Sequence, residues 1–222
     1  MANGTPFFNT IKLPTGQEVD IDRYGDYHLW STAHGFILAV AQEIECFNYK
    51  RGDTVPGTAV RATKLDTNLD KMQGALGYSE EMMVHGISIQ LPHWIAVDNS
   101  VVDSRLAQDM FAIIDQTYFH FDVLSKVYSE GTIDCYPFFG GLYTDSDVNN
   151  HEYVNNGMPM SGAAKPLALP IHLTGKSNFR AIFEFPRGAL AGLVNTDATH
   201  DYEIRVWLSG IRSRYEGTSF GG

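Results

Sequence analysis

The chain has 222 residues, of which 44% are hydrophobic and 19% are charged, a composition that excludes intrinsic disorder and suits a single folded domain spanning residues 1–222. Its 16 Lys and Arg against 26 Asp and Glu give a net charge of -10 at pH 7, which repels polyphosphate and disfavours direct binding of nucleic acid. Residues 1–16, MANGTPFFNTIKLPTG, contain one lysine and no long apolar run, so we expect no signal peptide, basic arm or membrane span.

The first quarter of the chain predicts short strands separated by glycine and proline. Residues 9–21, NTIKLPTGQEVDI, are typical of an opening hairpin that turns at residues 15–16. Residues 35–50, GFILAVAQEIECFNYK, are interpreted as a longer apolar strand that ends before the Arg-Gly-Asp turn at 51–53. That tripeptide can support cell adhesion, but it also serves as an ordinary charged turn in which glycine supplies the bend.

The middle of the chain predicts one strand and one helix. Residues 81–92, EMMVHGISIQLP, alternate in polarity and stop at a proline, which is typical of a strand. A helix is expected near residues 99–117, where apolar side chains recur at helical spacing after a possible cap at Asn99 or Ser100. The expected apolar face of the strand is Met83, His85, Ile87, Ile89 and Leu91, and that of the helix is Val102, Leu106, Met110, Ile113 and Ile114.

After the helix, strands and loops alternate. Residues 118–139 predict two strands joined by a tight turn near Glu130 and Gly131. Residues 140–166 are rich in Gly, Asn, Asp and Ser, which predicts a loop-rich excursion. Strand structure is expected to resume over residues 166–175, PLALPIHLTG.

Two C-terminal segments alternate most strictly between apolar and polar side chains. Residues 178–188, NFRAIFEFPRG, and residues 201–214, DYEIRVWLSGIRSR, are both predicted to be half-buried strands. The expected apolar faces are Phe179, Ala181, Phe183 and Phe185 in the first strand and Tyr202, Ile204, Val206 and Leu208 in the second, with Glu203, Arg205, Trp207 and Ser209 on the opposite face of the second.

Together these elements predict an all-β fold. Eight or more strands, one inserted helix near 99–117 and several long connections suit a single jelly-roll β-sandwich of two antiparallel sheets. In such a fold the final strand returns to the centre of a sheet, so we expect residues 201–214 to complete the core.

One pattern could support metal chemistry. His120 and Asp122 are two residues apart, so a strand would project both from one face. With His172 as a third ligand they would form the two-imidazole, one-carboxylate set of a non-haem iron oxygenase, and Arg180 could anchor a keto-acid cosubstrate. The alternative, which we favour, is that these are polar residues on an exposed sheet face.

Other candidate ligand sites have equally ordinary explanations. Asp145, Asp147 and Asn149 are spaced like the start of a calcium loop, but the expected turn glycine and bidentate glutamate are missing, which favours a solvated turn. Cys46 and Cys135 are interpreted as buried free thiols. The sequence also lacks nucleophile-elbow and phosphate-loop motifs, so no catalytic, cofactor-binding or metal residue and no cofactor is assigned. A stacking platform for sugars could use the three tryptophans, Trp30, Trp94 and Trp207.

The C-terminal strands resemble those of jelly-roll capsid proteins of tailless icosahedral bacteriophages and related viruses. The resemblance rests on two strand motifs, one of the form F-x-x-x-F-x-F-P and one of the form I-R-V-x-L-x-G that ends in basic residues. Residues 64–89 and 131–143 show weaker similarity to middle segments of the same family. The matching residues of the two motifs are Phe179, Phe183, Phe185 and Pro186, then Ile204, Arg205, Val206, Leu208 and Gly210, followed by Arg212 and Arg214.

The resemblance implies a structural coat subunit without catalytic activity. It implies a homo-oligomer, as a trimer or pseudo-hexameric capsomer, with a second coat protein as a further possible partner and the virion as location after synthesis in the host cytoplasm. The chain has no basic arm, so we expect a shell separated from its genome, or an appendage or filament subunit. A β-sandwich module that binds carbohydrate or a host surface is the main alternative function.

Overall fold

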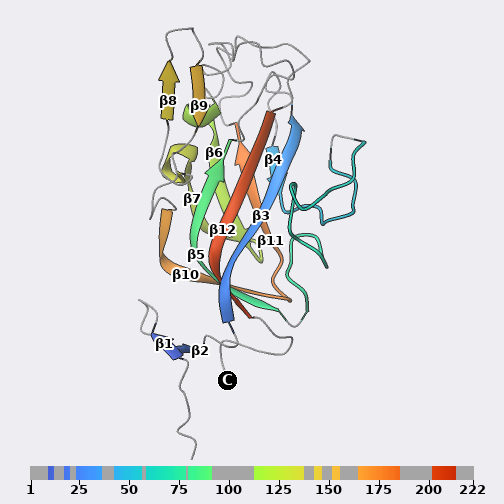
Figure 1. Ribbon diagram of the computed structural model, residues 1–222, viewed down its shortest axis with the longest axis vertical. Helices are drawn as coiled ribbons and strands as arrows, with labels where there is room; N and C mark the ends of the chain where they lie inside the picture. Colours follow the sequence, from blue (N-terminus) through green and yellow to red (C-terminus); the bar gives the residue numbers. More distant parts are fainter. Residues whose placement is uncertain are drawn as a thin grey trace, which may run out of the picture.

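The computed structural model describes residues 10–12, 18–20, 24–36, 43–56, 59–78, 80–91, 113–137, 143–146, 152–155, 165–185 and 202–213. Two four-stranded antiparallel sheets pack against each other in this part of the chain (Figure 1). The β12 sheet has the order β10-β5-β12-β3, and the β11 sheet has the order β4-β11-β6-β7. Their strands are β3 (Tyr24–Phe36), β4 (Glu43–Cys46), β5 (Glu81–Gln90), β6 (Tyr118–Val123), β7 (Lys126–Thr132), β10 (Lys165–Thr174), β11 (Phe179–Glu184) and β12 (Tyr202–Ser213).

The eight sandwich strands pair in a nested order. The first, β3, pairs with the last, β12, and the second, β4, pairs with the second to last, β11. Further inward, β5 pairs with β10 and β6 with β7, always antiparallel. This order, in which a folded-over ribbon is wound into two sheets, defines a jelly roll. The predicted all-β jelly-roll sandwich is therefore confirmed.

Two short hairpins lie outside the sandwich sheets. The opening hairpin is confirmed, because β1 (Thr10–Lys12) pairs antiparallel with β2 (Glu18–Asp20). A second hairpin, β8 (Tyr143–Ser146) with β9 (Glu152–Asn155), lies inside the segment predicted to be a loop-rich excursion. That excursion thus contains regular structure which its Asn- and Asp-rich composition did not indicate.

The core lies between the two sheets and is rich in phenylalanine. The rings of Phe119 and Phe183 face each other across β6 and β11 at 5.2 Å between centroids, and Phe119 also packs edge-on against Tyr136 at 4.7 Å. Aromatic pairs at such distances add stability beyond the area that they bury. Tyr136 follows the short 3-10 helix η1 (Ile133–Cys135) and is fully buried.

The apolar faces predicted for β11 and β12 agree with the structure, except that the side chain of Tyr202 lies outside the described residues. Ile204, Val206 and Leu208 are fully buried on the core side of β12, whereas the residues between them are only half-buried. β12 pairs with β3 on one side and with β5 on the other. The final strand therefore occupies the middle of its sheet and completes the core.

The prediction for β5 was wrong in its first half. Met82 and Val84 are buried, and Met83 and His85 lie on the opposite face from Ile87 and Ile89. The cause is an irregularity in the ladder, since Ser209 pairs with Gly86 but Gly210 pairs with Val84, which leaves His85 without an opposing residue on β12. An extra residue of this kind is a β-bulge, and it moves the alternation to the other face.

The predicted turn between β6 and β7 was also misplaced. The strands turn at Leu124 and Ser125, whose φ angles are 51° and 63°, and Glu130 and Gly131 lie within β7. Positive φ at both central residues is the geometry of a two-residue type I′ hairpin, which usually contains Asn-Gly. Leu-Ser gave no such signal in the sequence.

The predicted helix near 99–117 falls mostly outside the described residues. Residues 113–116 are helical, and Ile113 and Ile114 are buried, as the pattern predicts. Within the described chain, no helix combines the length and apolar character needed to cross a membrane.

Residues 47–56 and 59–78 run along the free edge of β3, at the right of Figure 1. The amide of Thr32 donates to the Asp66 carbonyl at 2.9 Å, and the amide of Asn68 donates to the Trp30 carbonyl at 3.3 Å. The Arg-Gly-Asp turn lies in this segment, where Arg51 pairs with Asp70 at 3.0 Å. Around residues 30–32 the backbone of β3 is therefore not free to pair with another chain.

Candidate functional site

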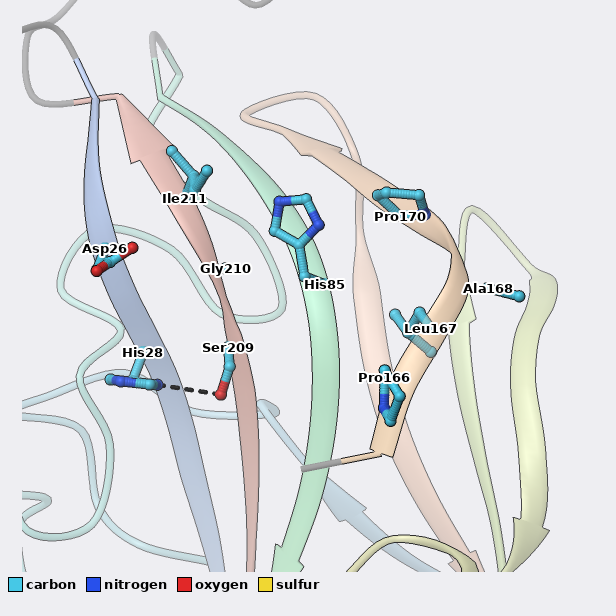
Figure 2. Close-up of a pocket in the computed structure, with 10 residues that line it drawn as sticks. All are labelled: Asp26, His28, His85, Pro166, Leu167, Ala168, Pro170, Ser209, Gly210 and Ile211. Carbon is cyan, nitrogen blue, oxygen red and sulfur yellow. Dashed lines mark hydrogen bonds between the residues drawn. The ribbon is translucent and has the colours of Figure 1, made fainter. Parts of the chain in front are cut away.

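The outer face of the β12 sheet contains an open concavity of about 610 Å³ (Figure 2). Its volume falls within the usual range for small-molecule sites. Residues of four strands line it, namely Asp26 and His28 of β3, His85 of β5, Ser209, Gly210 and Ile211 of β12, and Pro166, Leu167, Ala168 and Pro170 of β10.

Strand irregularities form this concavity. Between Pro166, which pairs with Gly86, and Ile171, which pairs with Val84, residues 167–170 of β10 have no partner on β5. In Figure 2 this part of β10 bows away from β5, and the His85 ring projects into the space between them. Bulges of this kind occur next to binding sites, where they re-aim side chains.

One wall of the concavity is polar and the other is apolar. His28 Nδ1 and Ser209 Oγ are 3.1 Å apart and form a hydrogen bond across β3 and β12. Burial lowers the pKa of His85, so its imidazole is neutral at pH 7, and its Nε2 is buried without a hydrogen-bond partner among the described residues. None of the lining residues is Lys or Arg, so the arrangement suits a neutral or cationic ligand rather than an anion.

Two tryptophans extend this outer face along the sheet. Trp207 and Trp30 are directly opposite in the β12–β3 ladder, with ring centroids 5.0 Å apart. Their indole nitrogens donate to Gln90 Oε1 and to the Lys64 carbonyl, each at 3.1 Å. The prediction that Trp207 points away from the core is confirmed, and Trp94 lies outside the described residues.

His34 links the outer sheet face to residues 47–78. Its Nδ1 is 2.9 Å from Glu203 Oε1 and its Nε2 is 3.0 Å from Asp66 Oδ1. Burial alone would lower the pKa of His34, but the hydrogen bond and charge of Glu203, together with the charge of Asp66, raise it above its ordinary value. The two carboxylates of Glu203 and Asp66 therefore favour the protonated, imidazolium form of His34.

A second concavity, of about 590 Å³, lies at the β6–β7 turn and the adjoining parts of β4 and β11. Asp122 lines it, and its Oδ2 accepts from Arg180 Nε at 3.3 Å and Nη2 at 3.2 Å. The Asp122 side chain is only 7% exposed, and no described residue donates a hydrogen bond to its Oδ1. Asn48 Oδ1, in the same lining, is also buried and has no donor in the described ranges.

The candidate iron ligands do not meet. His120 and Asp122 project outward from the β11 sheet, because their neighbours Phe119 and Phe121 are in the core. His172 projects outward from the other sheet and is 3.2 Å from Glu81. Among the described residues no three His, Cys, Asp or Glu side chains are grouped closely enough to hold a metal. Arg180, the candidate cosubstrate anchor, pairs with Asp122 instead.

The remaining candidates have mixed outcomes. Asp145 lies in β8, opposite Tyr153, but Asp147 and Asn149 fall outside the described residues. The prediction of two buried thiols was wrong for Cys135, which is exposed at the end of η1. Cys46 is buried, and burial raises its pKa to about 12.

Sequence reasoning did not identify the residues of the outer concavity. His28, Ser209 and Asp26 carry no motif, and their proximity depends on the register of β3 against β12. A weak signal was available in Gly86 and Gly210, because glycine inside a strand pattern often marks a bulge.

No protein-family model and no curated protein matches the chain.

Proposed function

We propose that the protein is a self-assembling coat subunit of a virion, with a structural rather than a catalytic function. The observation that carries the proposal is the nested order of β3 with β12, β4 with β11, β5 with β10 and β6 with β7. Jelly rolls of this order build viral shells, although lectins and cupins share the architecture. The resemblance of the last two strands to phage coat proteins favours the first of these uses.

Exposed apolar side chains support a role in assembly. Leu169 on β10 is 82% exposed, and Val127 and Tyr128 are exposed on β7, which is the edge of the other sheet. Leu65 and Val60, in the segment that covers β3, are 76% and 64% exposed. Repeated contacts between copies would bury such side chains, as in the trimer or pseudo-hexameric capsomer that the family implies.

The test is the size of the purified protein. Sedimentation velocity over increasing concentration, combined with negative-stain images, is expected to reveal symmetric oligomers or closed particles. A chain that stays monomeric at the highest soluble concentration, including after mixing with other coat proteins of the same virion, would end the proposal.

Ligand binding at the outer concavity is a second candidate function. The specific observation in its favour is that His85, whose Nε2 is buried without a partner among the described residues, lines the same concavity as the His28–Ser209 pair and the apolar wall of β10. A panel of neutral mono- and disaccharides, followed by NMR shifts of the imidazole protons, tests this module function. Ligand-induced shifts at His28 and His85 of the wild-type chain, with the His28 shift lost in His85→Phe, would favour it, and unchanged wild-type spectra would count against it.

A further inference from the structure

The outer face of the β11 sheet has an excess of carboxylates. Glu43 and Glu45 project outward from β4, because Ile44 and Cys46 are in the core. Glu184 of β11 lies directly opposite Glu43 in the ladder, and like charges in that position destabilise a strand pair. His120 Nε2 lies 3.5 Å from Glu184 Oε1, but neither Glu43 nor Glu45 has an ion-pair partner in the described chain. We call Glu43, Glu45, Asp122 and Glu184 the acidic face.

The concavity at Asp122 contains two oxygen atoms that no donor of the described residues satisfies. Glu45, Asp122 and Asn48 line it, and Asp122 Oδ1 and Asn48 Oδ1 are the two buried acceptors. Arg180 also lines the concavity, but its contacts with Asp122 are to Oδ2. A cation with several N–H groups that docks beside the concavity would supply donors and opposite charge for Glu45, which is only partly buried.

The same chain presents cations of this kind on another surface. Arg61 and Lys64 are exposed in residues 59–65, and neither side chain pairs with a carboxylate within the described residues. Arg61 follows the exposed Val60, and Lys64 precedes the exposed Leu65. We call residues 59–65 the basic segment. Leu124, 64% exposed, lines the concavity at the acidic face and provides an apolar partner for it.

We propose that the basic segment of one copy docks on the acidic face of a second copy, with Arg61 donating to Glu45 and Lys64 facing Glu43. Opposite charges then meet across the contact, and Leu65 packs against Leu124. In a chain with a net charge of -10, such a contact replaces general repulsion between copies by local attraction and fixes their orientation. The inference rests on the proposed self-assembly, because it requires two copies.

Exchanging the charges of Arg61 and Glu45 tests the proposed contact between copies. Sedimentation velocity at low salt is expected to reveal association of the wild-type chain that weakens at about 1 M salt, where the screening length falls to about 3 Å. Arg61→Glu is expected to weaken association about tenfold or more, because it places like charges together. The double variant Arg61→Glu with Glu45→Arg is expected to restore association.

A composition-matched variant provides the control. Arg61→Glu with Asp134→Arg has the same net charge as the restoring variant, but Asp134 is exposed on η1, outside the acidic face. It should associate as weakly as Arg61→Glu alone. Near-UV circular dichroism verifies each fold, and Lys64→Glu replaces Arg61→Glu if the latter does not fold.

The outcomes separate this contact from self-assembly itself. If the wild-type chain associates but Arg61→Glu and Lys64→Glu associate equally well, the contact is wrong and self-assembly stands. Equal rescue by Glu45→Arg and Asp134→Arg also overturns the contact, because only net charge would then matter. If the wild-type chain remains monomeric under all conditions, self-assembly and the contact both fail.

Discussion

Gly210 lies where β12 passes the bulge of β5, and the space beside its Cα is already occupied. A Cβ at this position would be 2.0 Å from the Met83 carbonyl oxygen and 2.9 Å from the Val84 Cα. These are backbone atoms of a central strand, so they cannot move aside without breaking the ladder. The glycine therefore allows β12 to remain paired across an irregular neighbour.

We expect Gly210→Ala to destabilise the fold by about 3 kcal/mol, at the upper end of the usual cost of overpacking. Urea unfolding followed by fluorescence measures the change. Gly52→Ala is the control, because Gly52 has a φ of 90° but nothing lies within 4 Å of its added Cβ, so only the left-handed backbone cost of about 1–2 kcal/mol applies. Equal losses in the two variants would contradict the steric argument.

His34 makes stability depend on pH in a defined direction. Because Glu203 and Asp66 raise its pKa above the ordinary value of 6.5 in spite of burial, the folded state binds the proton more tightly than the unfolded state does. This stabilisation is complete below pH 6.5 and is lost as the pH rises through the raised pKa.

We expect His34→Gln to lower the free energy of unfolding by about 1.5 kcal/mol near pH 6, the scale of a hydrogen bond to a charged group. The deficit should shrink as the wild-type imidazole loses its proton at higher pH. Denaturant titrations of both chains over this pH range measure it. A deficit that grows with pH would reverse the assigned sign.

Among the strands, regular alternation was predictable and local irregularity was not. β12 keeps strict alternation up to Gly210, so its faces could be assigned from the sequence. In β3, Ser31 is fully buried on the core side and accepts a hydrogen bond from the Phe47 amide at 2.9 Å. Because a serine occupies this core position, the alternation of apolar side chains along β3 is interrupted. No strand was therefore predicted for these residues.

The outer concavity was unpredictable for a related reason. Its walls depend on where pairing fails between β10 and β5, and no local pattern determines a ladder shift. The proline at each end of the bow, Pro166 and Pro170, is consistent with the interruption because proline cannot donate to the ladder. The proximity of His28 and Ser209 can be recognised only once the register of β3 against β12 is known.

The β6–β7 turn offers a stabilising change at the element scale. Leu124 and Ser125 both adopt positive φ, which costs L-residues about 1–2 kcal/mol each. Replacing the pair with Asn-Gly, the preferred type I′ sequence, is expected to raise the free energy of unfolding by about 1 kcal/mol. Thermal unfolding of the double variant measures this gain, and a lower melting temperature would rule out relief of backbone strain as the dominant effect.

For the whole molecule, cooperativity depends on the last strand. β12 joins β3 to β5, so its removal divides the β12 sheet in two and exposes the core face of both parts. From the strand order we expect β12 to be essential for the fold. The first hairpin, β1–β2, belongs to neither sandwich sheet, so we expect it to be dispensable.

We expect a chain that lacks residues 202–222 to lose near-UV circular dichroism and its cooperative thermal transition. A chain that lacks residues 1–23 is the matched control and should retain both. Cooperative unfolding of the C-terminal truncation would show that the two halves of the sheet can pair without β12.

The central position of β12 also matters during biosynthesis. Until its last strand leaves the ribosome, the nascent polypeptide has the inner edges of β3 and β5 unpaired. This interval favours capture by a chaperone, and it allows the β12 segment of one molecule to insert into the vacancy of another. The strand order therefore favours exchange of β12 between molecules, and rapid expression should increase the fraction of exchanged molecules.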